Sequence, residues 1–155
     1  MDEKKFKISE RNLKTILLVE DTPQEMRRGQ ELLTNEGYKV PVADNFCDAS
    51  RILAEVRPSG VLTDLFIFHD KGRPDPDFAG GLLVVAQCVQ QHIPVVVCSS
   101  ESSHGNKAML PSMLCSLMDW EFVGGMAEDG GKDWNFALLL LKRKVGDEPP
   151  LPGDE

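Results

Sequence analysis

Acidic and hydroxyl residues stand directly after three apolar runs of this sequence. Glu20 and Asp21 follow the run ILLV, Asp64 follows GVLT, and Ser99 follows VVVC. Carboxylates that are brought close together either raise a pKa or hold a hard cation. An all-oxygen site suits Mg²⁺, which binds through one or two carboxylates and leaves room for a phosphoryl group. These residues therefore predict a magnesium site at Glu20 and Asp21, beside which Asp64 is available as a nucleophile that forms an aspartyl phosphate.

The elements around the apolar runs must position these side chains. Short apolar runs bounded by turn signals predict buried strands, and the stretches between them have the apolar spacing of helices. We expect strands within 16–19, 38–44, 60–68, 93–98 and 121–125, and helices within 22–37, 45–58, 78–92, 107–120 and 133–144. This alternation predicts an α/β fold, a doubly wound parallel sheet with helices on both faces. The carboxyl ends of its strands form one edge, where the acids and Ser99 should converge.

The composition fits a single domain with no nucleic-acid or membrane partner. The 155 residues include 25 acidic and 17 basic ones, which gives a net charge of −8. This charge disfavours binding to a nucleic acid through neutralisation of its phosphates. The sequence shows no apolar window long enough to span a membrane and no signal peptide, so we expect a cytoplasmic protein. The domain is expected at 13–145, between flexible tails at 1–12 and 146–155.

The sulfur and imidazole side chains show no familiar metal or disulfide spacing. The cysteines are Cys47, Cys88, Cys98 and Cys115, and the histidines are His69, His92 and His104. We therefore predict buried free thiols, and histidines that lie at the surface or at helix ends. Met109, Met113 and Met118 share one helical face, which we predict to pack against the core.

One long stretch carries a family resemblance. The segment ILLVEDTPQEMRRGQELLTNEGYKVPVADNFCDASRILAEVRPSGVLTDL resembles the receiver domain of two-component response regulators. The acidic pair, the pattern GY.V..A, the aspartate that ends the third strand and the hydroxyl that ends the fourth occur in the same order. The resemblance extends from about Leu13 to Val145. It implies a flavodoxin-like (CheY-like) fold, with a five-stranded parallel sheet in the order 2-1-3-4-5.

The resemblance also implies the chemistry of the site. Asp64 would accept a phosphoryl group from a histidine kinase or a phosphotransfer protein. Glu20 and Asp21 would bind Mg²⁺ together with the backbone carbonyl of Phe66. Such a domain at most phosphorylates and dephosphorylates itself, so we expect a phosphoacceptor in a phosphorelay and not an enzyme.

Further positions would transmit the signal. Ser99 would contact the phosphoryl oxygens, with Ser100 as the neighbouring alternative, and Phe122 stands where the family has an aromatic residue that turns inward on activation. A downstream effector protein would bind the face made by the last two helices and the fifth strand. Four successive leucines, 138–141, sweep about 300 degrees around the last helix, so at least one should lie on the outer face. A homodimer through this helix is an open alternative.

Two features depart from the family pattern. The fifth strand of a receiver domain normally ends in a lysine that pairs with the phosphoryl group, and the matching position here is Gly125. Loss of this cation should slow phosphoryl transfer, unless Lys132 or Lys107 substitutes for it. The loop at 66–79, which contains His69, is longer than usual. It could be a lid, a source of a compensating cation, a determinant of partner choice or a solvated insertion.

Three functions therefore remain open from the sequence. The first is a stand-alone receiver domain that is phosphorylated on Asp64. The second is a pseudo-receiver that works as an unphosphorylated interaction or dimerisation module, which the missing lysine favours. The third, a magnesium-dependent hydrolase, lacks a recognisable general base and substrate pocket. The plain alternatives are that Asp21 caps a helix while Glu20 is solvated, and that Ser99 belongs to a turn.

Overall fold

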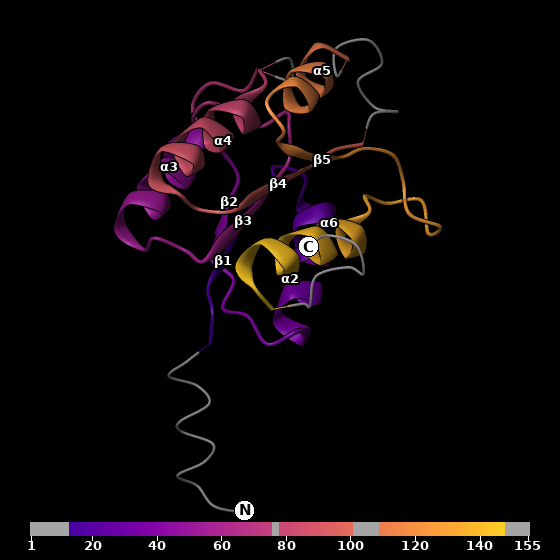
Figure 1. The fold of residues 1–155 in the computed structure, drawn as a ribbon. Helices are drawn as coiled ribbons and strands as arrows, with labels where there is room; N and C mark the ends of the chain where they lie inside the picture. Colours follow the sequence, from indigo (N-terminus) through magenta and orange to yellow (C-terminus); the bar gives the residue numbers. More distant parts are fainter. Residues whose placement is uncertain (1–12, 76–77, 101–108, 148–155) are drawn as a thin grey trace, which may run out of the picture.

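The computed structural model describes residues 13–75, 78–100 and 109–147, which form a five-stranded parallel sheet between helices (Figure 1). The strand order is β2-β1-β3-β4-β5, as predicted. The strands are β1 (Ile16–Val19), β2 (Val42–Ala43), β3 (Gly60–Thr63), β4 (Val95–Cys98) and β5 (Glu121–Val123). The predicted third strand is too long at its carboxyl end, because the chain leaves the sheet at Asp64.

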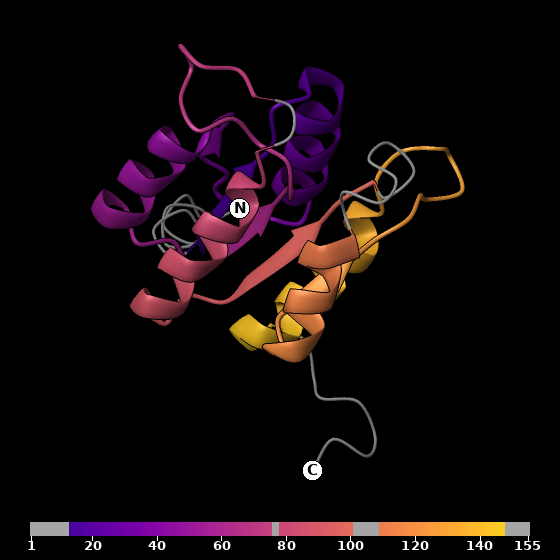
Figure 2. The same ribbon diagram turned by 90° about the horizontal axis from the view of Figure 1, so that it is seen from above.

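Five helices cover the two faces of the sheet. They are α2 (Pro23–Asn35), α3 (Phe46–Glu55), α4 (Gly80–Gln91), α5 (Met109–Leu117) and α6 (Trp134–Val145). Helices α3, α4 and α5 lie on one face and α2 and α6 on the other, which Figures 1 and 2 show from two directions. The alternation of strands and helices therefore gives the predicted three-layer architecture.

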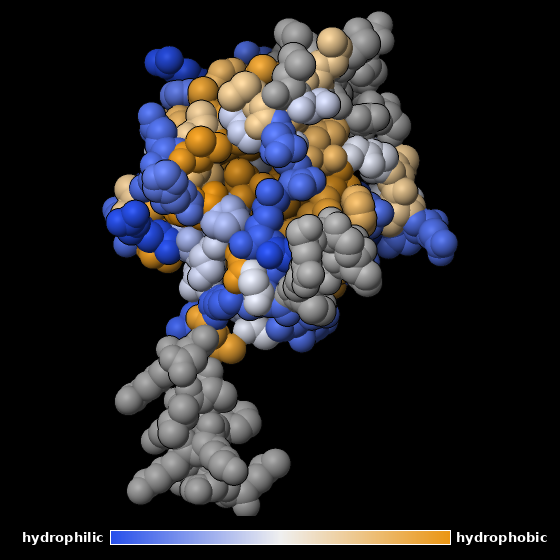
Figure 3. Space-filling view, viewed as in Figure 1, coloured by the Kyte–Doolittle hydropathy of each residue, from blue (hydrophilic) through white to orange (hydrophobic). Residues whose placement is uncertain are grey.

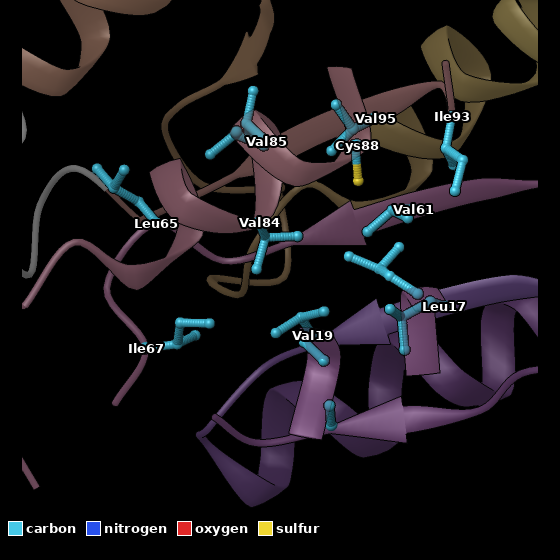
Figure 4. Close-up of a cluster of buried hydrophobic side chains, with 14 of the residues drawn as sticks. Leu17, Val19, Val61, Leu65, Ile67, Val84, Val85, Cys88, Ile93 and Val95 are labelled. Atoms are coloured by element: carbon cyan, nitrogen blue, oxygen red, sulfur yellow. The ribbon is translucent and has the colours of Figure 1, made fainter. Parts of the chain in front are cut away.

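Each face of the sheet buries its own apolar cluster. On the α3–α4 side, Leu17 and Val19 of β1 and Val61 of β3 pack against Val84 and other residues of α4 (Figure 4). The second cluster joins the sheet to α2 and α6 and includes Leu33, Leu138 and Leu141. All four residues of β1, β3 and β4 are buried, because both faces of a parallel sheet are covered.

Local signals explain where several helices begin and end. Asn45 caps α3, since its side chain accepts a hydrogen bond from the backbone N–H of Asp48 at 3.0 Å. Asp133 caps α6 in the same way through the N–H of Phe136. Thr22, and not Asp21, occupies the N-cap position of α2, and the Thr22 side chain makes no capping hydrogen bond. No helix in the described part of the chain is long and apolar enough to cross a membrane.

The ends of the domain are tied together within the described residues. Tyr38 donates a hydrogen bond to Asp147 at 2.8 Å, and Lys14 forms an ion pair with the same carboxylate. The chain therefore makes tertiary contacts as far as Asp147, two residues into the predicted C-terminal tail of 146–155. The predicted N-terminal tail, 1–12, lies outside the described residues.

Helix α5 corrects one prediction about the core. Met113 of α5 and Met118, which follows the helix, are 55% and 53% exposed, whereas Pro111 and Cys115 are buried. The side chain of Met109, the third methionine of the prediction, lies outside those that the structure describes. The face that packs on the sheet is therefore the one that carries Pro111 and Cys115. In Figure 3, apolar residues reach the surface in the upper part of the molecule, where Figure 1 places α5.

Candidate functional site

Three carboxylates meet at the carboxyl edge of the sheet. Val19 of β1 lies opposite Thr63 of β3, so Glu20 and Asp64 leave their strands at the same level. One ligand oxygen from each of Glu20, Asp21 and Asp64 lies within 4.8 Å of the others. Glu20 is fully buried, Asp64 is 4% exposed and Asp21 is partly exposed. Parallel register therefore brings Glu20 and Asp64 together at one edge, as predicted.

Burial disfavours the ionised form of these carboxylates. Burial, together with the charge of Asp64, raises the pKa of Glu20 to about 7. Burial and the charge of Glu20 raise the pKa of Asp21 to about 6. The pKa of Asp64 is also raised, chiefly by burial. A cluster of this kind gains free energy from a cation that replaces lost solvation and reduces repulsion.

Lys132 supplies one such cation from within the protein. Its Nζ atom lies 2.9 Å from Oδ1 of Asp64 and donates a hydrogen bond to Glu20. Although burial by itself lowers the pKa of Lys132, the charges of Asp64 and Glu20 raise it above its ordinary value. The fifth strand is followed by Gly125 and not by a lysine, and Lys132, one of the two substitutes considered, places a positive charge in the pocket. Lys107, the other, lies outside the described residues.

The loop between β5 and α6 carries Lys132 back to the pocket. Gly125, where the lysine was expected, has a φ of +89°, a conformation that a lysine side chain disfavours. The chain then reverses, since Ala127 and Gly131 are joined by a hydrogen bond and Met126 pairs antiparallel with Lys132. The ammonium group thus reaches Asp64 from a hairpin-like loop instead of from the end of the strand.

Helix α2 holds this loop in place. The Arg28 guanidinium donates to Glu25 at 2.9 and 3.0 Å and to Asp129 of the loop at 2.7 Å. Glu25 in turn accepts a hydrogen bond from the indole N–H of Trp134 at 2.8 Å. A Cβ atom on Gly131 would lie 1.5 Å from Nη1 of Arg28, so the guanidinium would have to move if this residue carried a side chain. These contacts are made by residues on both sides of Lys132 in the sequence. No sequence motif indicated them.

Ser99 directly follows β4 at the carboxyl edge of the sheet. Its backbone N–H donates to Val123 at 2.9 Å, which fixes the residue at the end of β4. Its side chain is fully buried, and Oγ has no hydrogen-bond partner among the described residues. A buried hydroxyl without a partner is costly, and its presence calls for an explanation such as a functional role or a bound water or ion. Ser100, the alternative, is only partly buried.

No protein-family model and no curated protein matches this sequence. Solved structures do match. A response regulator receiver protein from Sinorhizobium medicae is 19% identical, with a TM-score of 0.66 over 88% of this chain and 97% of that one. A receiver domain protein from Clostridium thermocellum is 17% identical, with a TM-score of 0.65 over 86% and 95%. The receiver domain of NtrX from Brucella abortus is 20% identical, with a TM-score of 0.59 over 86% and 99%. The chain has the receiver-domain fold.

Within this receiver fold, the donors around Asp64 suit a hard divalent cation. Glu20, Asp21 and Asp64 offer carboxylate oxygens, which Mg²⁺ prefers, and the pKa values of Glu20 and Asp21 are raised by burial and by the charge of a neighbouring carboxylate. Phe66 follows Asp64 by two residues, and its backbone carbonyl as a further ligand stays a prediction. The Leu65 N–H and Lys132 both donate to Oδ1 of Asp64, and not to Oδ2.

Phe122 and the leucines of α6, which we expect to transmit the signal, pack on opposite faces of the sheet. Phe122 of β5 and the neighbouring Trp120 are partly buried and pack against the α3–α4 cluster. Phe122 therefore occupies the expected strand, and its role as a switch stays a prediction. The leucines of α6 divide as geometry requires: Leu138 and Leu141 are buried, whereas Leu139 is 37% exposed.

The long loop after β3 is anchored away from the acidic pocket. The backbone N–H of Phe46 donates to Phe68 at 2.8 Å, and that of Cys47 donates to His69 at 2.9 Å, which ties the loop to the start of α3. Lys71 pairs with Asp48 of α3 at 3.5 Å. Within the described residues, the compensating cation of the pocket therefore comes from Lys132 and not from Lys71.

Proposed function

We propose that this chain is a receiver domain whose Asp64 accepts a phosphoryl group in a magnesium-dependent transfer. The observation that carries the proposal is the joint placement of Asp64, the acidic pair and Lys132 at one edge of a receiver fold. The donor is a phosphohistidine of a kinase or phosphotransfer protein, or a small acyl phosphate. The protein itself acts as the acceptor, so it turns over no external substrate.

The residues around Asp64 have different roles in this transfer. A carboxylate oxygen of Asp64 attacks phosphorus, the P–N bond to the donor histidine breaks, and the leaving imidazole takes a proton. Glu20, Asp21 and Asp64 would hold Mg²⁺, which supplies positive charge beside the phosphoryl oxygens. Lys132 neutralises negative charge at Asp64. The Ser99 hydroxyl donates a hydrogen bond to a phosphoryl oxygen.

Lys132 favours this function over the phosphorylation-independent interaction module. The sequence argument for a pseudo-receiver was the missing lysine, and the buried ammonium group beside Asp64 removes it. An interaction module has no need of a buried lysine among three acids, which is a costly arrangement. The signal would leave through α5, β5 and α6, where Met113, Phe136 and Leu139 are exposed.

Intact mass after incubation with Mg²⁺ and acetyl phosphate tests the proposal. We expect the full chain to gain one phosphoryl group, and both the Asp64→Ala variant and a sample without Mg²⁺ to gain none. Trp134 gives a second readout, because Lys132 Nζ lies 5.6 Å from its ring centroid and responds to charge at Asp64. A folded wild-type chain that stays unmodified with both acetyl phosphate and a phosphohistidine donor would favour the interaction module.

A further inference from the structure

The loop after β3 and the first turn of α3 bring together a thiol, an imidazole and a carboxylate. The Sγ atom of Cys47 lies 3.8 Å from Nδ1 of His69, and the same Nδ1 lies 3.3 Å from Oδ2 of Asp70. One ligand atom from each residue lies within 4.8 Å of the others. These residues are outside the acidic pocket, and the spacing of cysteines and histidines in the sequence gave no sign of them.

We propose that Cys47, His69 and Asp70 bind a divalent transition metal of the zinc type. Thiolate, imidazole and carboxylate are the ligands of zinc, with bonds of about 2.3 Å to sulfur and about 2.0–2.2 Å to nitrogen and oxygen. In tetrahedral geometry these bonds place sulfur about 3.6 Å from nitrogen and nitrogen about 3.3 Å from oxygen. The observed separations, 3.8 and 3.3 Å, are already close to those of a bound site.

The geometry favours a metal over a catalytic cysteine. In a cysteine–histidine–acid relay, the two ring nitrogens contact different partners, since one activates the thiol and the other is oriented by the acid. Here Cys47 and Asp70 face the same nitrogen, Nδ1 of His69. Three donor atoms that converge on one point match a cation. The fourth position is open to water, because Cys47 and His69 are exposed.

The ligands are held in place before a metal binds. The His69 ring packs against Phe46 at a centroid distance of 5.8 Å and against Phe78, edge to face, at 5.7 Å. The backbone N–H of Cys47 donates to the His69 carbonyl at 2.9 Å, which fixes the two ligand-bearing segments relative to each other. Preorganisation of this kind reduces the ordering that binding requires.

Binding would link the loop covalently to α3 through the metal. The thiol proton of Cys47 is released to solvent as the metal–sulfur bond forms, so affinity increases with pH. Because His69 belongs to the segment that directly follows Asp64, an occupied site would restrain that segment. The proposal concerns a second site and does not depend on phosphorylation of Asp64.

Cobalt and zinc titrations of the full-length reduced chain, in excess Mg²⁺ that competes at the acidic pocket, test this inference. We expect one equivalent of Co²⁺ to produce a thiolate-to-metal charge-transfer band, and Zn²⁺ to displace it. The Cys47→Ser variant should lose the band, and both it and His69→Gln should bind Zn²⁺ at least about tenfold more weakly. His92→Asn is the matched control and should behave as the wild type, because Asn tolerates the left-handed conformation of His92, φ 56°.

Two results would overturn the proposal. One is a wild-type chain that shows no thiolate-to-cobalt band. The other is a zinc affinity that is the same in wild type, Cys47→Ser and His69→Gln, which would place the bound metal elsewhere. The Asp21→Asn variant identifies the acidic pocket as that other place if its zinc affinity alone decreases. Near-ultraviolet circular dichroism of each variant confirms that the fold is intact.

Discussion

Nζ of Lys132 lies 2.9 Å from Oδ1 of Asp64, although the lysine belongs to a loop that follows β5 and not to the strand itself. The same nitrogen donates to Glu20, so one ammonium group contacts both of the acids that are buried. The positive charge that the proposed transfer to Asp64 requires is therefore supplied from a different position in the chain. The position of the charge relative to Asp64, and not its place in the sequence, decides whether it can stabilise a phosphoryl group.

Replacement of Lys132 should slow phosphorylation. We expect Lys132→Met to reduce the rate of modification by acetyl phosphate by about tenfold or more, since a preplaced donor at the reacting group is lost. Intact mass against time measures this rate. Lys144→Met is the matched control, because Lys144 is exposed and lies 3.9 Å from Glu121, far from the pocket's contacts. Equal rates in wild type and Lys132→Met would show that the ammonium group takes no part in the transfer.

The contacts that hold the β5–α6 loop should matter although they touch no reacting atom. Arg28→Met removes the bonds to Glu25 and Asp129, so the loop that carries Lys132 loses its anchor on α2. We expect a phosphorylation rate several-fold lower than wild type, with Mg²⁺ affinity little changed. Arg27→Met, the exposed neighbour, should have no effect. If Arg28→Met leaves the rate unchanged and lowers only the melting temperature, the contact is purely structural.

The sequence predicted the fold and the acidic pocket because both follow from local patterns. Apolar runs specify buried strands, and parallel register then brings Glu20 and Asp64 to one edge without any further information. The position of Lys132 depends instead on the path of a loop, which tertiary contacts with Arg28 determine. The meeting of Cys47 with His69 likewise depends on a loop that pairs with α3. Contacts between distant loops leave no periodic signal in a sequence.

The raised pKa values predict how Mg²⁺ and pH act on stability. Asp21 titrates near 6 and Glu20 near 7 in the folded chain, above the ordinary values of 3.8 and 4.5. Between about pH 4 and 7 the folded state therefore binds more protons than the unfolded state, so without metal the free energy of unfolding decreases as pH rises. Mg²⁺ favours the ionised acids, and its stabilising effect should increase over the same range.

Removal of one acid separates these effects. Asp21→Asn should raise the metal-free free energy of unfolding at pH 7.5 by about 1 kcal/mol, because a carboxylate that repels Glu20 is lost. The same variant should lose most of the stabilisation by Mg²⁺. Chemical denaturation with and without Mg²⁺ at several pH values measures both quantities, and Asp44→Asn is the control outside the pocket. A metal-free Asp21→Asn protein that is less stable than wild type would contradict the repulsion.

The exposed leucine of α6 should report self-association. Leu139 and Phe136 lie on the outer face of the helix, 37% and 48% exposed. If a homodimer forms through α6, Leu139→Glu should abolish it, whereas Leu83→Glu on α4, a leucine 40% exposed, should not. Sedimentation velocity with and without beryllofluoride detects the change. A wild-type chain that is monomeric in both states would remove the dimer and leave this face to an effector protein.

Ser99 should be dispensable for folding and important for the modified state. Its Oγ atom is buried without a partner among the described residues, so Ser99→Ala removes an unsatisfied group. We expect an unmodified variant as stable as wild type, or more stable by up to about 1 kcal/mol. Beryllofluoride with Mg²⁺ should raise the melting temperature of wild type and Ser100→Ala, but that of Ser99→Ala much less. If Ser100→Ala is the variant that loses the shift, the hydroxyl that contacts the phosphoryl group is that of Ser100, the alternative that the sequence left open.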